Sequence, residues 1–454
     1  MNRGIAKNPN KNPNKNPNKN PKSNISQLEE RMLARLKWRG AVASFFAAAA
    51  VAVFLTPAKA QAPSGEPVKI GFSMSLTGPL SPNGKQALLG MKIWEEETNA
   101  KGGLLGRPVK LIYYDDQSAA GPVPGIYTKL LEVDKVDLVI GPYATVPAAA
   151  AMVAVIPKSK VFIILFGLAV NTEFNYPKFF AMIPTGPNPK PSFTEGFFEV
   201  AAAQNPKPMT AALIAADQEF SRNACEGARE NAKKHGIRIV YDKTYPPTQT
   251  DFSPVVRAIQ AVVPDVVCVC SYPLDSVGIV RTVNEVGYKP KLIGGAMVGL
   301  QATAIKRQLG PLLNGWVNYE TWVPAKALMF DGTEAFLKQY QARAGAEGVD
   351  PLGYYLGTWG YAYIQILGEA VQATKSLDDN KLADYIGKTT FKTIMGDVKF
   401  GKGGEWEQGR MLQVQYHDIK SGDLEQFRGM DTQTVLTPSQ YKTGDLIYPY
   451  EKAK

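Results

Sequence analysis

The feature that most constrains this chain is an alternation of short apolar runs with amphipathic helical patterns, which occurs twice along the sequence. In the first part, runs of strand length are Val68–Phe72, Val109–Tyr114, Leu138–Ile140 and Val161–Leu165. Helical patterns such as Gln86–Ala100 separate them. Strands that alternate with helices predict a parallel, doubly wound sheet that is buried on both faces. We therefore expect an α/β fold.

The same pattern begins again after 184–191, a stretch rich in Pro and Gly that indicates a crossover to a second part. The strands expected there are Met209–Ala215, Ile237–Tyr241, Val266–Cys270 and Lys291–Ile293. Ligands of such sheets bind beyond the carboxyl ends of the strands. Two Rossmann-like lobes joined by several chain passages would therefore form a cleft that closes on a ligand.

The segment Asp137–Ala148 is the best candidate for a ligand contact. Leu138–Ile140 predicts a short buried strand, a Gly-Pro pair ends it, and Thr145 is typical of a helix N-cap. The free N–H groups at such a tip and the helix dipole both attract an anion. We expect a seat for a carboxylate or another acceptor, with Thr145 as an added hydroxyl donor. The alternative is that Thr145 only caps its helix.

Residues 1–60 resemble a leader rather than a folded domain. Lys7–Pro21 repeats Lys-Asn-Pro-Asn, a polar low-complexity tract. From Met32 there follow a basic segment, an apolar run over Ala41–Leu55 and a small-x-small triplet that ends at Ala60, which together predict a secretory signal peptide. We expect cleavage after Ala60, with cleavage after Ala62 as the second choice. Two alternatives remain: the apolar run is an uncleaved membrane anchor, or translation begins at Met32.

Nine of the ten net positive charges come from this leader. Without the 11 basic and 2 acidic residues of 1–60, the 51 basic and 41 acidic residues of the whole chain fall to 40 and 39. The remainder is nearly neutral, so the charge does not support nucleic-acid binding. We expect an exported protein in the periplasm with no nucleic-acid partner.

Three cysteines bear on the redox state of the fold. Cys268 and Cys270 stand two apart on one face of an expected strand, so they do not bridge each other easily. The sequence leaves undecided whether Cys225 forms a disulfide with one of them. The cysteines and histidines have no metal-binding spacing, and we expect neither a metal nor a cofactor.

An enzymatic function has little support in the sequence. The chain has two histidines, His235 and His417, and neither is accompanied by a nucleophile pattern. The pair Asp115-Asp116 follows an expected strand and could hold a cation, but capping of the next loop is favoured. We therefore expect a binding protein and not an enzyme.

Four motifs resemble the leucine/isoleucine/valine-type periplasmic binding proteins, the type I solute receptors of branched-chain amino acid ABC transporters. They begin at Val68 (VKIGFSMSLTGP), Asn99 (NAKGGLLGRPV), Tyr113 (YYDD) and Asp137 (DLVIGP). The resemblance implies two Rossmann-like lobes with a hinge of three crossovers. It places lobe I at 67–184 and 322–408 and lobe II at 185–321 and 409–445.

The resemblance also implies a ligand site. In amino-acid binders of the family, a hydroxyl residue after the turn of the third strand holds the ligand carboxylate, and Thr145 stands there. A second hydroxyl is usual where this chain has Ala169, and an acidic partner of the α-ammonium is usual where it has Ala296. The candidate ligand-binding residues are Tyr143, Ala144, Thr145, Phe166, Gly167, Leu168, Ala169, Phe220, Tyr272, Ala296 and Met297.

These departures bear on the ligand. A buried ammonium without a counter-charge is costly, so an aromatic or other apolar carboxylate or amide is favoured over a standard α-amino acid. Asp217, Glu219 or Asp275 stays open as a source of the missing charge. The resemblance implies a monomer that delivers its solute to an inner-membrane ABC permease. The alternative is a stand-alone sensor of the same fold that feeds a receptor or regulator.

Overall fold

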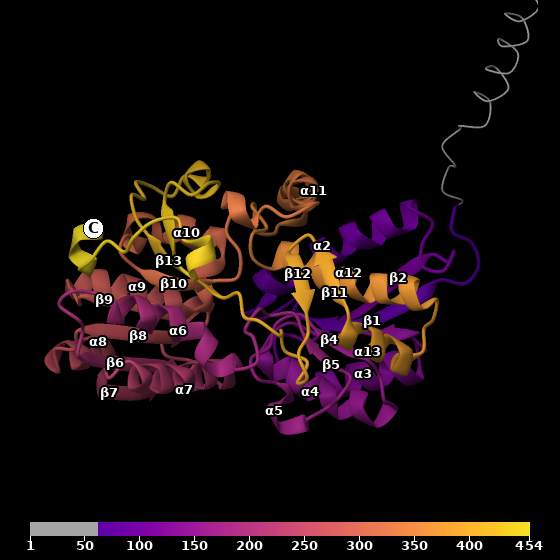
Figure 1. Cartoon of the computed structure of the whole chain (residues 1–454), viewed down its shortest axis with the longest axis horizontal. Helices are drawn as coiled ribbons and strands as arrows, with labels where there is room; N and C mark the ends of the chain where they lie inside the picture. Colours follow the sequence, from indigo (N-terminus) through magenta and orange to yellow (C-terminus); the bar gives the residue numbers. More distant parts are fainter. Residues whose placement is uncertain (1–61) are drawn as a thin grey trace, which may run out of the picture. The chain divides into compact units, whose positions relative to one another are not determined.

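The computed structural model describes residues 62–454, which belong to one compact unit. The leader and the signal peptide predicted for 1–60 lie outside the described residues. The described part contains a three-stranded sheet, a seven-stranded sheet and two two-stranded sheets, with helices on their faces (Figure 1). We call the three-stranded sheet, both two-stranded sheets and their helices the first lobe, and the seven-stranded sheet with its helices the second lobe.

The first lobe opens with alternating strands and helices. Its elements are β1 (Val68–Met74), α2 (Ser81–Ala100), β2 (Val109–Asp115), α3 (Val123–Glu132), β3 (Leu138–Val139), α4 (Thr145–Val155), η1 (Ile156–Lys158), β4 (Phe162–Ile164), α5 (Asn171–Phe174) and β5 (Phe179–Ala181). The strands β2-β1-β3 form a parallel sheet in that order, and β4 and β5 form a parallel pair. A parallel bridge between Tyr143 and Phe166 brings the tips after β3 and β4 together.

The second lobe repeats the pattern. Its elements are α6 (Pro189–Ala202), β6 (Thr210–Ala216), α7 (Glu219–Lys234), β7 (Arg238–Tyr245), α8 (Ser253–Ala261), β8 (Val266–Ser271), α9 (Pro273–Val286), β9 (Leu292–Met297), η2 (Val298–Gln301), α10 (Thr303–Leu309), η3 (Gly310–Leu313) and β10 (Val317–Glu320). Every residue of β8 is buried, as expected for a central strand with both faces covered.

The chain then returns to each lobe once more. The first lobe gains η4 (Lys326–Leu328), α11 (Thr333–Glu347), α12 (Leu356–Thr374), α13 (Asp379–Lys388), β11 (Thr390–Thr393) and β12 (Gly396–Lys399). The second lobe gains β13 (Leu412–Tyr416), η5 (Leu424–Phe427), β14 (Gln433–Thr437), η6 (Ser439–Tyr441) and η7 (Tyr450–Ala453). The second sheet has the order β14-β13-β10-β9-β8-β6-β7, with β13 and β14 antiparallel.

The chain therefore passes between the lobes three times: after β5, after β10 and after β12. This agrees with the predicted α/β class and hinge of three crossovers. The residue boundaries that we assign to the lobes stay a prediction.

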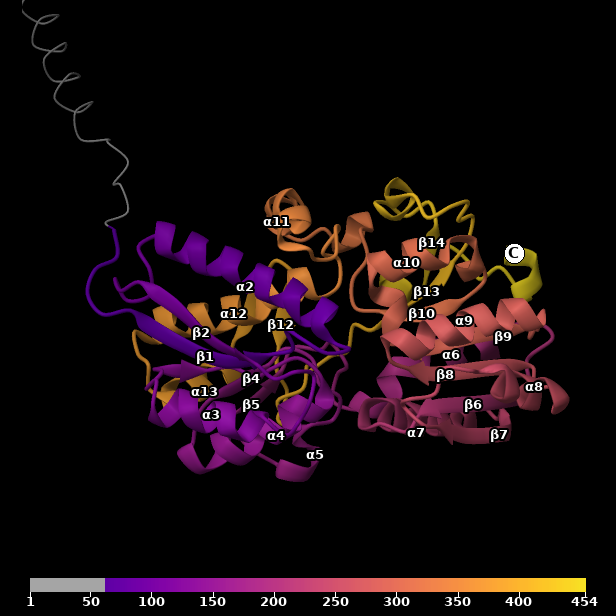
Figure 2. The ribbon, with the colours of Figure 1, turned by 180° about the vertical axis from the view of Figure 1, so that it is seen from behind.

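Helices α2 and α12 lie side by side in both views of the chain (Figures 1 and 2). Glycines let their backbones approach. A Cβ added at Gly90 would lie 2.2 Å from the carbonyl oxygen of Gly357, and one at Gly360 would lie 2.4 Å from that of Ala87. This contact fastens the late helix of the first lobe to its opening βα unit.

Two sequence expectations are refined by the structure. Helix α2 begins at Ser81 instead of Gln86, because Pro82 fits the first turn of a helix and does not end the preceding loop. The disulfide that stayed open forms between Cys225 of α7 and Cys270 of β8, and Cys268 is a buried free thiol.

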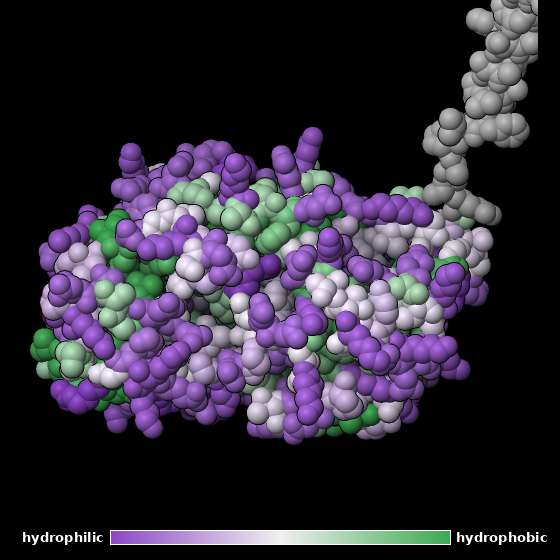
Figure 3. Space-filling view, in the orientation of Figure 1, coloured by the Kyte–Doolittle hydropathy of each residue, from purple (hydrophilic) through white to green (hydrophobic). Residues whose placement is uncertain are grey.

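The surface of the described residues is mainly polar on the face shown in Figure 3, where hydrophobic residues occur in scattered spots. Within residues 62–454, each helix is too short or too polar to cross a membrane.

Candidate ligand-binding site

A small cavity lies where strand tips of the first lobe meet residues of the second lobe. It has a free volume of about 30 Å³, which holds little more than one water, so a larger solute requires its walls to move apart. Its lining residues are Tyr143, Ala144, Thr145, Phe166, Gly167, Leu168, Ile183, Phe193, Phe220, Tyr272, Val298, Tyr319 and Tyr355.

Thr145 lines this cavity, but it is not the N-cap that the sequence predicted. It is the first residue of α4, and the N-cap is Ala144 without a side-chain cap. The Thr145 Oγ1 accepts a hydrogen bond of 3.0 Å from the backbone N–H of Leu168. Because the hydroxyl acts there as an acceptor, its own proton is left to donate. The N–H groups of Thr145 and Val146 add donors that have no intrahelical partner, whereas Pro147 has no N–H.

The backbone at Ala144 is strained. Its φ of 78° and ψ of 154° fall in a region that is essentially reserved for glycine and costs about 1–3 kcal/mol for other residues. A hydrogen bond of 2.8 Å from the Ala144 N–H to the Phe166 carbonyl oxygen holds it there. Strain of this kind concentrates at ligand sites, because it fixes groups in positions that an unstrained turn would not give.

Aromatic side chains of both lobes form the walls. Ring centroids are 5.2 Å apart for Phe193 and Phe220, 4.8 Å for Phe193 and Tyr319, and 5.7 Å for Phe220 and Tyr272. Phe166 packs on Tyr355 at 5.7 Å from the side of the first lobe. The walls therefore suit a flat apolar body between edge-to-face rings.

The polar groups on these walls are phenols. The Tyr143 Oη accepts a 2.8 Å hydrogen bond from Asn83 Nδ2 and lies 3.4 Å from the Tyr355 Oη. Burial raises the pKa of Tyr143, Tyr272, Tyr319 and Tyr355 above the ordinary phenol value, so all four are protonated at neutral pH. They offer neutral donors and acceptors to a ligand.

The lining contains no ionised side chain. The sequence left three carboxylates as candidate partners of a ligand ammonium. The first, Asp217, forms an exposed ion pair with Arg222 at 3.1 Å. Asp275 accepts a 2.5 Å hydrogen bond from Tyr245 and lines a neighbouring cavity that shares only Tyr272 with this one. Burial raises the pKa of Asp275 to about 6. Glu219, at the start of α7, is also absent from the lining.

Most of the predicted ligand residues meet at this cavity. Tyr143, Ala144, Thr145, Phe166, Gly167, Leu168, Phe220 and Tyr272 all line it. Ala296 and Met297 do not, because they are buried within β9, and the next residue, Val298, lines the cavity instead. Ala169 faces a different concavity.

The sequence interpretation missed Ile183, Phe193, Tyr319 and Tyr355. Ile183 follows β5 at the first crossing and Tyr319 lies in β10 at the second, a strand that the sequence patterns did not predict. The rule that ligands lie at the carboxyl ends of strands would have pointed to Tyr319 once β10 was known. Phe193 and Tyr355 give no such signal, because they come from α6 and from the loop before α12.

The pair Asp115-Asp116 has a structural role. Asp115 accepts hydrogen bonds from Thr77 and Gln117, and Asp116 accepts them from Ser73 and Ser75. Residues 62–454 contain no cluster of three His, Cys, Asp or Glu placed to hold a metal ion.

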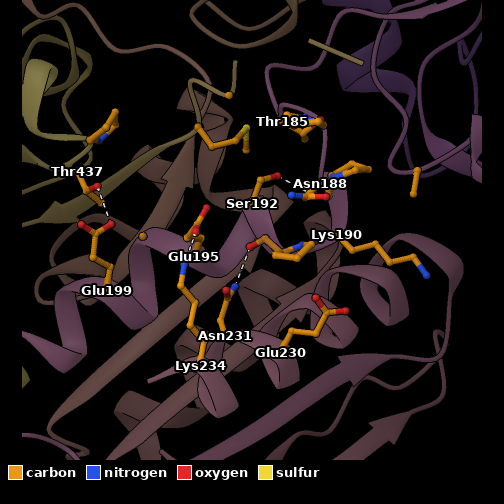
Figure 4. A pocket seen from close by; sticks show the side chains of 18 of the residues that line it. Thr185, Asn188, Lys190, Ser192, Glu195, Glu199, Glu230, Asn231, Lys234 and Thr437 are labelled. Carbon is orange, nitrogen blue, oxygen red and sulfur yellow. Dashed lines mark hydrogen bonds and ion pairs between the residues drawn. The ribbon is translucent and has the colours of Figure 1, made fainter. Parts of the chain in front are cut away.

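A larger concavity of about 940 Å³ lies elsewhere, next to the first crossing and helices α6 and α7 (Figure 4). Several of its charged groups have partners: Lys234 pairs with Glu195 at 2.9 Å, and Glu199 accepts a hydrogen bond from Thr437 at 3.3 Å. It is open and polar, so we take the enclosed aromatic cavity as the ligand site.

Two α/β lobes, three crossings and a cavity walled by both lobes define a two-lobed solute receptor. A family model described as "Periplasmic binding protein" matches residues 67–418. The chain belongs to this family and is of the leucine/isoleucine/valine type. Membership makes it an extracytoplasmic protein of a family whose members bind small solutes.

Known proteins resemble the chain over most of its length. The Leu/Ile/Val-binding protein homolog 8 of Brucella abortus is 26% identical over 376 residues, which cover 78% of this chain and 89% of the relative. The fold is similar to that of the branched-chain amino acid transporter substrate binding protein LivJ from Streptococcus pneumoniae in complex with isoleucine (TM-score 0.67, 19% identity, 82% and 100% coverage). It is also similar to that of an R. palustris ABC transporter solute binding protein in complex with benzoate (TM-score 0.68, 16% identity, 84% and 98% coverage).

Proposed function

We propose that this protein is the solute-binding component of a branched-chain amino acid-type ABC importer and that it captures a small organic acid with an aromatic or other apolar body. The observation that carries the proposal is the uncharged aromatic cavity with the Thr145 hydroxyl and the start of α4 at its floor. Such a site offers donors to a carboxylate but no counter-charge to an ammonium.

In this proposal the carboxylate, or an amide oxygen, meets Thr145 and the free N–H groups of α4 in the first lobe. The apolar body then lies against Phe166, and the second lobe closes with Phe220 and Tyr272 over it. The walls must separate before the solute enters, because the cavity is too small for it, and they then close over the bound solute. Among the structures of similar fold, the complex with benzoate supports this class of ligand and the complex with isoleucine supports the amino-acid alternative.

Delivery of the solute to an inner-membrane permease, action as a monomer, and export to the periplasm with cleavage near Ala60 and Gln61 are parts of the same proposal. The second candidate is a sensor that presents its closed form to a receptor or regulator. Family membership supports transport, because the structures of similar fold include ABC transporter proteins.

The test is a thermal-shift screen of the exported protein with benzoate, other aromatic acids, amine-free aliphatic acids, leucine, isoleucine and valine. A ligand at 100 times its dissociation constant stabilises the folded state by about 2.7 kcal/mol. We expect aromatic acids to raise the melting temperature and leucine to leave it unchanged. A shift with leucine, isoleucine or valine alone would contradict the amine-free ligand class.

Thr145→Ala is expected to weaken binding of the acid found in this screen by about 1–3 kcal/mol, because the loss leaves a buried polar group of the ligand without its donor. Calorimetric titration measures the effect. Thr172→Ala, in the short helix α5 away from the cavity, is the matched control. If both variants bind like the wild type, the carboxylate does not sit at Thr145.

A further inference from the structure

Three phenol hydroxyls meet in the ligand cavity, and capture of a carboxylate at Thr145 leaves them unused. Tyr143 comes from the turn after β3, Tyr355 from the loop before α12, and Tyr319 from β10. All three line the cavity, and each is at most 5% exposed. The Thr145 hydroxyl is bonded to the Leu168 N–H and not to a phenol. The cavity therefore has a second polar point, separate from Thr145.

The contacts between the hydroxyls show that these side chains converge. The Tyr143 Oη and the Tyr355 Oη lie 3.4 Å apart. The Tyr319 hydroxyl lies beside that of Tyr355, close enough for each to affect the pKa of the other. We call the hydroxyls of Tyr143, Tyr319 and Tyr355 the phenol cluster.

The spacing inside the phenol cluster leaves room for another oxygen. Hydrogen bonds between two oxygens are usually about 2.7–2.8 Å long, so the 3.4 Å between Tyr143 and Tyr355 is a weak contact. A third oxygen can lie at the usual distance from both of these hydroxyls at once. The pair is therefore better suited to share a ligand atom than to bond to each other.

The protons of the phenol cluster are not all used. Burial raises the pKa of the three phenols above the ordinary value, so they carry three protons at neutral pH. Asn83 Nδ2 donates to the Tyr143 Oη at 2.8 Å, which occupies a lone pair but no proton. The two contacts of the cluster use at most two protons, and residues 62–454 offer these hydroxyls no other acceptor. At least one buried donor is thus free, which is rare unless a ligand or a water accepts from it.

The phenol cluster is divided between the lobes. Asn83, Tyr143 and Tyr355 belong to the first lobe, as Thr145 does, so these groups stay together when the lobes separate. Tyr319 belongs to the sheet of the second lobe. A solute that lies on the first lobe therefore meets Tyr319 only on closure, and a polar group held by the cluster is contacted from both lobes.

We propose that the solute is a hydroxylated acid, whose carboxylate lies at Thr145 and whose hydroxyl, carried on the apolar body, is bound by the phenol cluster. This rests on the function proposed above and narrows its ligand class. A hydroxyl fits because it accepts the free phenol proton and donates its own proton to a phenol lone pair. An ammonium does not fit, because the cluster has no negative charge. An acid without the hydroxyl leaves the free donor unpaired, so the cluster selects against it.

The test is calorimetric titration of the exported protein with benzoate, 3-hydroxybenzoate and 4-hydroxybenzoate. We expect at least one hydroxybenzoate to bind about tenfold more tightly than benzoate, since benzoate leaves a buried donor unpaired. Tyr355→Phe keeps the ring and removes the hydroxyl. It is expected to weaken binding of that hydroxybenzoate about fivefold to tenfold and to change binding of benzoate less than about twofold. Tyr319→Phe should act in the same direction.

Tyr288→Phe is the matched control, because Tyr288 also has a buried hydroxyl without a partner but lies outside the cavity. It should keep the preference of the wild type. The proposal is overturned, with the proposed function intact, if benzoate binds as tightly as both hydroxybenzoates or if the preference survives in both Tyr355→Phe and Tyr319→Phe. Equal weakening of benzoate and the hydroxybenzoates in Tyr355→Phe also overturns it, because the carboxylate would then lie at the phenols. If none of the three acids binds, the aromatic body of the proposed ligand is wrong, and the hydroxylated acid fails with it.

Discussion

Replacement of both Cys225 and Cys270 by serine is expected to lower the free energy of unfolding by about 4 kcal/mol. The two cysteines are 45 residues apart in sequence, and a cross-link that closes a loop of this length removes about that much conformational freedom from the unfolded chain. Both side chains are buried, so the serine hydroxyls add a further cost. Urea unfolding of the wild type and the variant measures the difference.

Cys268→Ser is the matched control, because it places the same hydroxyl in the same buried strand without breaking a cross-link. It should cost clearly less than the double replacement. Reduction of the wild type by a thiol should reproduce most of the loss. Equal stability of the double variant and the wild type would mean that the two sulfurs are not joined in the exported protein.

The disulfide also bears on the ligand site. It joins α7 to β8. Phe220 lies at the start of α7, and Tyr272 directly follows the last residue of β8. Phe220 and Tyr272 form the aromatic wall that the second lobe offers to the solute. We therefore expect the reduced protein to bind the ligand found in the thermal-shift screen more weakly, even at temperatures where the protein is still folded, because the two rings lose a common support.

The sequence predicted the alternation of strands and helices well, since it depends on local patterns. Val266–Cys270 is an unbroken apolar run and forms a fully buried strand, and in Val68–Phe72 only the half-buried Lys69 interrupts the apolar pattern. The pairing of Cys225 was beyond the reach of such patterns. It depends on which helix covers which strand, and the cysteines themselves are spaced without a recognisable rule.

The candidate site divides in the same way. The tip residues Tyr143, Thr145 and Phe166 were predictable because the carboxyl ends of parallel strands meet at one edge. On the second lobe the prediction at β9 was one residue too early, since Met297 is buried in the strand and Val298 lines the cavity. Tyr319 and Phe193 reach the cavity through the packing of β10 and α6, which sequence periodicity does not report.

Lys306→Met is expected to destabilise the protein by about 3–5 kcal/mol, because it leaves the buried Glu320 without its counter-charge. The Lys306 Nζ lies 2.8 Å from the Glu320 Oε1, and the Tyr416 Oη donates to the same oxygen at 2.8 Å. Glu320 is the last residue of β10 and the neighbour of Tyr319 in the ligand cavity. The variant should therefore weaken ligand binding as well as folding. Urea unfolding measures the loss of stability, and titration with the ligand found in the thermal-shift screen measures the loss of binding.

The loss in Lys306→Met should depend on pH with a definite sign. Burial raises the pKa of Glu320 above 4.5 in the folded state, and removal of Lys306 raises it further. A carboxyl whose folded pKa is raised binds its proton more tightly when folded, so the penalty is small below about pH 4.5 and grows as pH rises toward 7.

The double variant Lys306→Met with Glu320→Gln removes the charge and should recover most of the loss at pH 7. Lys158→Met, from an exposed pair with Glu132, should change little at any pH. A deficit that is the same at pH 4.5 and pH 7 would mean that lost packing around Lys306, and not the buried charge, causes it.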